Sequence, residues 1–251
     1  MSGHSKWSSI KHKKGAADAK RGKLFSKLSR AIIVAAKEGG GDPAGNLALQ
    51  NAIEKAKSYS MPKDNIERAI AKGSGADAEG SHFETVVYEG YGPEGVAVLV
   101  EALTDNRNRT ASDVRHLFTK HGGNLGTTGA VAWLFERRGL VVVEADGVDE
   151  DELMLAAAEG GADDLERDGS VFQVSAPIEE LASVREAIEE AGFTVDSAEL
   201  AMVPKTTVAV EDESAAKKLM RLIDALEESD DVQDVFANFD IPERVLEAVA
   251  G

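Results

Sequence analysis

The sequence of 251 residues contains no cysteine, and only 5% of its residues are aromatic. Without cysteine the chain forms no disulfide, thiolate metal site or cysteine nucleophile, which fits a reducing compartment. The scarcity of aromatic residues predicts cores built mainly from Ala, Val, Leu and Ile. The longest apolar runs, such as 31–36 and 140–143, are far too short to span a bilayer. We therefore expect neither a disulfide-stabilised nor a membrane-spanning protein.

Signatures of enzyme chemistry are also missing. Gly90, Gly92 and Gly95 have the spacing of a dinucleotide-binding loop, but such a loop must open a helix, and a strand-like run over 96–103 follows instead. The five histidines show no metal-ligand spacing, and no G-x-S-x-G nucleophile motif occurs. We expect no catalytic residues, no metal, no cofactor and no small-molecule substrate.

Positive charge is concentrated at the start of the chain. Residues 1–72 carry 15 Lys and Arg against 6 Asp and Glu, or +9, whereas residues 73–251 carry 13 against 39, or −26. The basic start is not followed by the apolar stretch of a secretory signal. It is rich in lysine rather than arginine and runs into a patterned helix, which disfavours an organellar transit peptide. The division indicates a basic module, suited to a polyanion, carried by an acidic body.

The first 78 residues predict a small helical domain that follows a basic arm. Helices are expected over 16–37, 43–59 and 63–72, the first with Leu24, Leu28, Ile32 and Ala35 on one face. Gly39-Gly40-Gly41 ends the first helix, and Asp42 with Pro43 opens the second. Residues 73–80 are small and polar and predict a linker.

The rest of the chain alternates strands and helices. Strands are expected over 83–89, 96–103 and 131–135, with a helix from a Thr110 cap to His121 and a turn at 137–139. Residues 140–203 have the order βαββαβ, which is typical of a ferredoxin-like unit. The βαβ of 206–238 cannot form a domain alone, so we expect it to complete the ββαβ of 83–136.

These patterns predict an α+β multidomain protein, with an N-terminal three-helix domain and two ferredoxin-like α/β domains, the last inserted in the second. The predicted limits are 1–78 for the basic helical domain and 79–137 plus 205–239 for the discontinuous domain. The inserted domain covers 138–204, and 240–251 is left as a tail.

The basic arm and first helix are the main candidates for nucleic-acid binding, because phosphate neutralisation dominates such affinity. Acidic residues are nearly absent there, whereas a merely solvated face usually mixes signs. Trp7 either stacks on a base or anchors the arm to the helices. The candidate contacts are Lys6, Trp7, Lys11, His12, Lys13, Lys14, Lys20, Arg21, Lys23, Lys27 and Arg30.

A second group of polar and cationic residues lies near the start of the helix before His121. Side chains of this kind at a helix N-terminus suit a phosphate or an RNA backbone, and pairing of the arginines with nearby carboxylates is the alternative. The candidates are Arg107, Asn108, Arg109, Arg115 and Lys120.

Several motifs together resemble the YebC family, whose members include probable transcriptional regulators of bacteria and a mitochondrial translational activator. The similarity runs in order from residue 3 to about residue 240. The motifs are Gly3-His4-Ser5-Lys6-Trp7, Ile10-Lys11-His12-Lys13-Lys14, Asp18-Ala19-Lys20-Arg21-Gly22-Lys23, Met61-Pro62-Lys63-Asp64-Asn65-Ile66, Tyr88-Glu89-Gly90-Tyr91-Gly92-Pro93 and Leu103-Thr104-Asp105-Asn106-Arg107-Asn108-Arg109-Thr110.

The resemblance implies three domains, a cytoplasmic location, no cofactor and no catalytic residues. It implies either a non-enzymatic regulator of transcription that binds DNA, or a ribosome-associated translation factor that binds ribosomal RNA and relieves stalling at stretches such as polyproline. A third hypothesis is an interaction module whose acidic body binds a basic partner. No reading helix of a helix-turn-helix is evident in 1–72, so the sequence supports phosphate contacts rather than base recognition.

Overall fold

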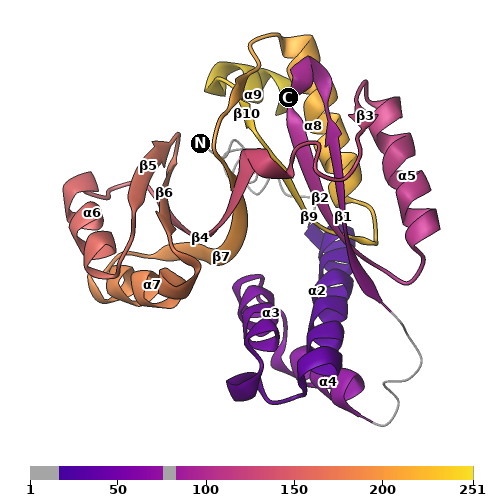
Figure 1. Cartoon of the computed structure of the whole chain (residues 1–251). Helices are drawn as coiled ribbons and strands as arrows, with labels where there is room; N and C mark the ends of the chain where they lie inside the picture. The colour runs from indigo at the N-terminus through magenta and orange to yellow at the C-terminus, as the bar shows by residue number, and fades with distance from the viewer. Residues whose placement is uncertain (1–16, 76–82, 251) are drawn as a thin grey trace.

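Three helices, α2 (Ala17–Gly39), α3 (Leu47–Ser58) and α4 (Lys63–Ser74), pack around one apolar core in the N-terminal domain. The computed structural model describes residues 17–75 and 83–250, and Figure 1 shows these helices beside two sheet-containing units. The predicted core face of α2 is confirmed: Leu28, Ile32 and Ala35 are buried, and Leu24 packs against them.

The second predicted helix is two elements, a short 3-10 helix η1 (Pro43–Gly45) and then α3. Asp42 caps η1, whereas the buried Asn46 caps α3 by accepting a hydrogen bond from the Leu49 amide. The Asn46 side-chain amide also donates to the carbonyls of Ala35 and Gly40. Asn46 thereby satisfies both the start of α3 and the end of α2, which explains the break.

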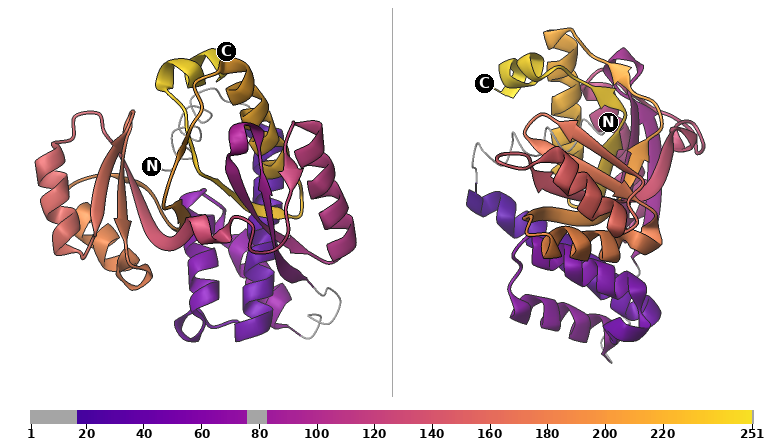
Figure 2. Two further views of the ribbon diagram at one scale, coloured as in Figure 1. Left: turned by 45° about the horizontal axis from the view of Figure 1, so that its top comes forward. Right: turned by 90° about the vertical axis from the view of Figure 1, so that its left-hand side faces the viewer.

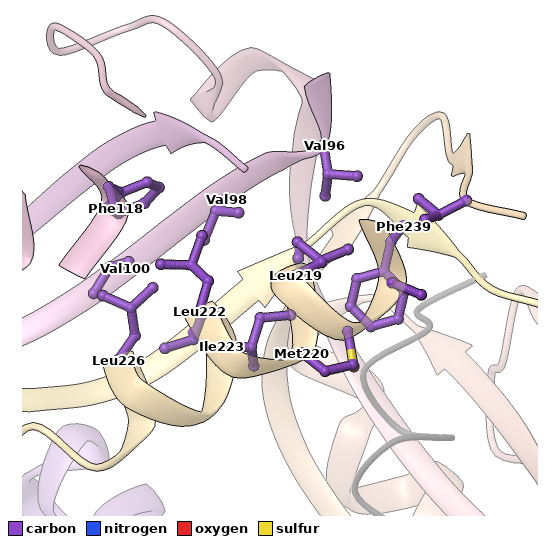
Figure 3. Packing of buried hydrophobic residues seen from close by; sticks show 14 of the residues in the cluster. Val96, Val98, Val100, Phe118, Leu219, Met220, Leu222, Ile223, Leu226 and Phe239 are labelled. Atoms are coloured by element: carbon purple, nitrogen blue, oxygen red, sulfur yellow. The ribbon is translucent and has the colours of Figure 1, made fainter. Parts of the chain in front are cut away.

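The middle domain has an antiparallel sheet with the order β3-β1-β2-β9. Its strands are β1 (Glu84–Tyr91), β2 (Ala97–Thr104), β3 (Asn124–Leu125) and β9 (Val232–Ala237). Helices α5 (Arg107–Lys120) and α8 (Glu213–Glu227) cover one face of the sheet. Figure 3 shows the resulting core, where Val98 and Val100 meet Leu219, Leu222 and other side chains of α8.

The inserted domain has the predicted βαββαβ order and the sheet order β5-β6-β4-β7. Its strands are β4 (Phe135–Glu144), β5 (Asp164–Asp168), β6 (Val171–Ala176) and β7 (Val195–Pro204). Helices α6 (Glu150–Glu159) and α7 (Leu181–Glu190) pack on one face of this sheet. The left view in Figure 2 shows the domain to one side of the middle sheet.

Strands β4 and β7 form the connection between the two sheet domains, pairing from Phe135 opposite Pro204 up to Val143 opposite Val195. The predicted turn at 137–139 is therefore wrong, because these residues continue β4. The predicted strand at 131–135 is also wrong, because a 3-10 helix η4 (Ala132–Leu134) precedes β4. Phe135 and Val131 are buried against Ala97 and Leu99 on the second face of the middle sheet.

A buried carboxylate shapes the loop before η4. Glu89 accepts hydrogen bonds from the amides of Gly129, Val131 and Ala132. Burial alone would raise the pKa of the Glu89 carboxyl, but these three donors outweigh it and hold the pKa below its usual value. The loop therefore folds over an anion that belongs to the sheet.

The last residues, predicted as a tail, are structured as far as residue 250. Strands β8 (Val208–Ala209) and β10 (Phe239–Asp240) form a short parallel pair, and α9 (Glu243–Ala250) follows. Val245 and Leu246 are buried in the core of the middle domain. The α+β fold class, with a helical domain and two strand-rich domains, is confirmed. The domain limits themselves stay a prediction.

Candidate nucleic-acid interface

The predicted basic arm lies outside the described residues, so Lys6, Trp7, Lys11, His12, Lys13 and Lys14 remain candidates from the sequence alone. Lys20 and Arg21 lie in α2, where the structure describes only the helix that carries them. The first described cation of the group is Lys23, and its side chain is exposed. Lys23 is one turn away from Lys27 along α2, and the two differ sharply in their surroundings.

Lys27 faces the middle domain. Its ammonium group donates a hydrogen bond to the carbonyl of Glu227 at the end of α8. Burial lowers the pKa of Lys27, and the nearby carboxylates of Glu227, Asp234 and Asp230 offset only part of that effect. In this arrangement the side chain holds α2 against the body and is not presented to a ligand.

Arg30, one turn further along α2, also contacts the middle domain. Its Nη1 donates to the carbonyl of Asp230 at 2.9 Å, to the carbonyl of Leu103 at 3.3 Å and to Oδ1 of Asp231 at 3.1 Å. The guanidinium group also lies over the ring of Phe83, 5.0 Å from its centroid. Every one of these partners belongs to the middle domain.

Asp231 joins the two groups of residues that the sequence analysis treats separately. Its Oδ2 accepts from Arg109 Nη2 at 2.9 Å and from the buried Thr110 hydroxyl at 2.7 Å, while Oδ1 accepts from Arg30. Burial would raise the pKa of the Asp231 carboxyl, but the Thr110 hydrogen bond and the two arginines outweigh it and lower the pKa. One carboxylate thus ties α2 to α5.

A second contact brings all three domains together. Lys55 of α3 forms ion pairs with Asp234 of β9 and, at 3.3 Å, with Glu199 of β7. Burial would lower the pKa of Lys55, but the two carboxylates outweigh it and raise the pKa. The neighbouring Tyr59 is also affected, since burial and then the charge of Glu199 raise the pKa of its hydroxyl to about 12.

The second group of predicted phosphate-binding residues lies on α5, and only its first arginines are paired with carboxylates. The helix begins at Arg107, four residues earlier than predicted, because Asn106 rather than Thr110 caps it. Arg107 lies 3.9 Å from Glu84, and Arg109 pairs with Asp105 and Asp231. Asn108, Arg115 and Lys120 are exposed, and neither Arg115 nor Lys120 has an acidic partner within the described part of the chain.

Sequence reasoning missed the residues that dock the helical domain. Asp230 and Asp231 lie in an acidic run that reads as a solvated face, and Lys55 lies on a helix with mixed charges. The only available signal was charge complementarity between the basic α2 and the acidic body, which does not identify partners. Partners about 200 residues apart cannot be paired from one sequence.

Over residues 17–75 and 83–250, no group of three or more acidic, Cys or His side chains lies close enough to hold a metal ion. The helices in these ranges include none that is long and apolar enough to cross a bilayer.

The fold and these contacts define a class of three-domain α+β proteins, in which a basic helical domain is docked on two acidic sheet domains. Residues 5–76 match the family model of the TACO1/YebC protein N-terminal domain, and residues 83–239 match that of the TACO1/YebC second and third domain. The chain belongs to this family, as its motifs predict.

Full-length relatives and a solved structure agree with this assignment. A probable transcriptional regulatory protein of Rubrobacter xylanophilus is 61% identical over 251 residues and is covered completely in both chains. Another protein of that name from Beutenbergia cavernae is 56% identical over 247 residues, or 98% of each chain. The crystal structure of a conserved hypothetical protein from Aquifex aeolicus is 54% identical, with a TM-score of 0.80 over 90% of this chain and 93% of that one. The relatives' names support a regulatory role.

Proposed function

We propose that the protein is a non-enzymatic, cytoplasmic regulator of gene expression that binds DNA through its basic N-terminal arm and the first turns of α2. The observation that carries the proposal is the division of charge, +9 in residues 1–72 against −26 in the remainder. A polyanion is the natural partner of such a segment, because neutralising phosphates releases condensed counterions. The relatives named probable transcriptional regulatory proteins favour DNA as the partner.

The structure narrows the residues that the proposal uses. Lys27 and Arg30 hold α2 on the body, whereas Lys23, nearer the arm, is exposed. We therefore assign the phosphate contacts to Lys6, Lys11, Lys13, Lys14, Lys20, Arg21 and Lys23, and the docking to Lys27 and Arg30. No described element presents a recognition helix for the major groove, so the proposed binding tolerates different sequences.

Binding to a labelled DNA duplex tests the proposal. For about five neutralised phosphates, log K should fall with log salt at a slope of roughly −4 to −5. The substitutions Lys11→Ala, Lys13→Ala and Lys14→Ala together should weaken binding and flatten that slope. Lys63→Ala, an exposed lysine on α4 paired with Glu67, serves as a control and should change neither. If the affinity of the unmodified protein for DNA does not depend on the salt concentration, the proposal is contradicted.

A ribosome-associated translation factor is the second candidate, and the same arm would then contact ribosomal RNA. The TACO1/YebC family assignment is compatible with this candidate, since the resembled family includes a translational activator. Sedimentation of cell lysates with unmodified protein and with the triple arm variant separates the two. Co-migration with ribosomes alone, lost in the variant, would refute the transcriptional role.

A further inference from the structure

A second group of cations lies on the middle domain, on two helices that are far apart in the sequence. Helices α5 and α8 pack side by side on the same face of the sheet, through Val114 and Phe118 of α5 and Leu219 and Leu222 of α8. The side chains opposite these buried residues point away from the sheet. Five of them are exposed cations, namely Arg115, Lys120, Lys217, Lys218 and Arg221.

The charge of this face contrasts with that of the body around it. Residues 114–123 and 214–223 contain these five cations, His116 and His121, and no Asp or Glu, in a body whose net charge is −26; the exposed Asp113 and Glu213 precede the two stretches. None of the five forms an ion pair within the described part of the chain, whereas Arg30, Lys55, Arg109, Arg138 and Arg185 all do. A solvated surface usually mixes signs.

The two helices bring their cations within electrostatic reach of each other. His121 lies just beyond the end of α5, and burial together with the charges of Lys120, Arg221 and His116 lowers its pKa. Lys120 and Arg221 therefore both act on His121, although they are 101 positions apart and lie on different helices that contact each other. Lys217 and Arg221 are one turn apart, about 6 Å along α8, a spacing that suits successive phosphates of a strand.

We propose that Arg115, Lys120, Lys217, Lys218 and Arg221 form a second nucleic-acid surface, the α5–α8 surface, which binds the phosphate backbone of the same ligand as the basic arm. This inference rests on the proposed function and adds a site to it. The hydroxyls of Ser112 and Ser214, both exposed on these two helices, supply neutral donors to phosphate oxygens. The five cations and two hydroxyls of this surface suit phosphate contacts rather than base recognition, so it contributes affinity without sequence preference.

The test is fluorescence anisotropy with full-length protein and a labelled 30-base-pair duplex, prepared as DNA and as RNA. The variant carries Lys120→Gln, Lys217→Gln and Arg221→Gln. Each lost phosphate contact should reduce the salt slope by about one, so the triple variant should lose about three. Its affinity near physiological salt should fall by at least about tenfold. The matched control, Arg167→Gln, Arg185→Gln and Lys205→Gln, removes the same charge elsewhere and should change the slope by less than about one.

The outcomes are distinguishable. Circular dichroism and thermal unfolding check whether both triple variants keep the native fold. If the arm variant loses affinity and the α5–α8 variant does not, the second surface is refuted and the proposed function stands. If the unmodified protein binds neither duplex, the proposed function itself fails. If polyglutamate of equal charge competes as well as nucleic acid for the α5–α8 surface, its partner is an acidic protein and the inference is overturned.

Discussion

Asp231 shows how one side chain connects segments that are distant in the sequence. It accepts hydrogen bonds from Arg30 of α2 and from Arg109 and Thr110 of α5, and the Thr110 hydroxyl oxygen lies 2.8 Å from the Thr104 hydroxyl oxygen. A carboxylate has enough acceptor sites for all of these donors, whereas an amide does not. Residue 231 therefore contributes to holding α2 in place, together with the backbone carbonyls that bind Lys27 and Arg30.

We expect Asp231→Asn to destabilise the docked arrangement by about 1–3 kcal/mol, since donors lose a charged acceptor. The effect depends on pH. Because the folded-state pKa of Asp231 lies below its unfolded value of 3.8, its contribution is complete well above pH 3.8 and is lost as pH falls through the folded value. Urea unfolding of both proteins at pH 7 and pH 3 should show the difference shrinking at pH 3. An equal difference at both pH values would contradict this.

Glu89 gives a second prediction at this scale. In Glu89→Gln, the three amides of Gly129, Val131 and Ala132 face one carbonyl oxygen and an amide group that repels them. Hydrogen bonds to charged groups are the stronger kind, so we expect a loss of about 2–3 kcal/mol. Hydrogen exchange should locate the loss in residues 126–134. Protection unchanged there would show that the loop holds its shape without the carboxylate.

At the scale of elements, helix packing depends on where glycine is placed. A β-carbon on Gly73 of α4 would lie 2.3 Å from the Ile33 carbonyl and 2.8 Å from the β-carbon of Ala36 on α2. Gly22, inside α2, has no neighbour within 4 Å of that position. The same residue type thus permits a close crossing at one site and merely lowers helix propensity at the other.

The two glycines therefore predict opposite responses to one substitution. Gly73→Ala should destabilise the helical domain by about 1–3 kcal/mol, because the backbone of α2 must shift. Gly22→Ala should stabilise it by up to about 1 kcal/mol through helix propensity alone. Thermal unfolding followed by circular dichroism measures both, and a rise in stability for Gly73→Ala would disprove the close contact.

Elements were predictable from the sequence wherever one periodicity decided the outcome. The apolar face of α2 and the βαββαβ order of the inserted domain needed only local patterns. Residues 131–139 could not be assigned from local patterns. Arg137 and Arg138 belong to β4 because they pair with β7, more than 60 residues away. The last helix was missed because its partners, in α8, lie outside its own segment.

At the scale of the whole molecule, local sequence patterns also could not define the candidate site fully. Charge alone identified the basic segment, and it equally placed Lys27 and Arg30 on the binding face. Which cations bind a ligand and which bind the protein depends on where the acidic body lies in space. The sequence carries no local signal for that distinction, since Lys23 and Lys27 have similar neighbours along the chain.

Lys55 provides a test of the three-domain arrangement. Lys55→Met leaves Glu199 and Asp234 without their shared cation and should cost about 1–3 kcal/mol, with a larger radius of gyration by small-angle scattering. Adding Glu199→Gln and Asp234→Asn removes the uncompensated charges and should restore most of the stability. If the single variant keeps the radius of gyration and melting temperature of the parent, the ion pairs do not hold the domains together.

The distance along the chain between Arg30 and Asp231 also has a consequence for synthesis. Translation adds about 5–20 residues each second, so roughly 10–40 s separate the appearance of α2 from that of its docking partners. During that interval Lys27 and Arg30 lack Glu227, Asp230 and Asp231, their partners in the complete protein. The nascent helical domain therefore carries its full positive charge close to the mRNA and the ribosome that synthesise it. It becomes a docked, partly neutralised domain only when the last strands of the middle sheet are complete.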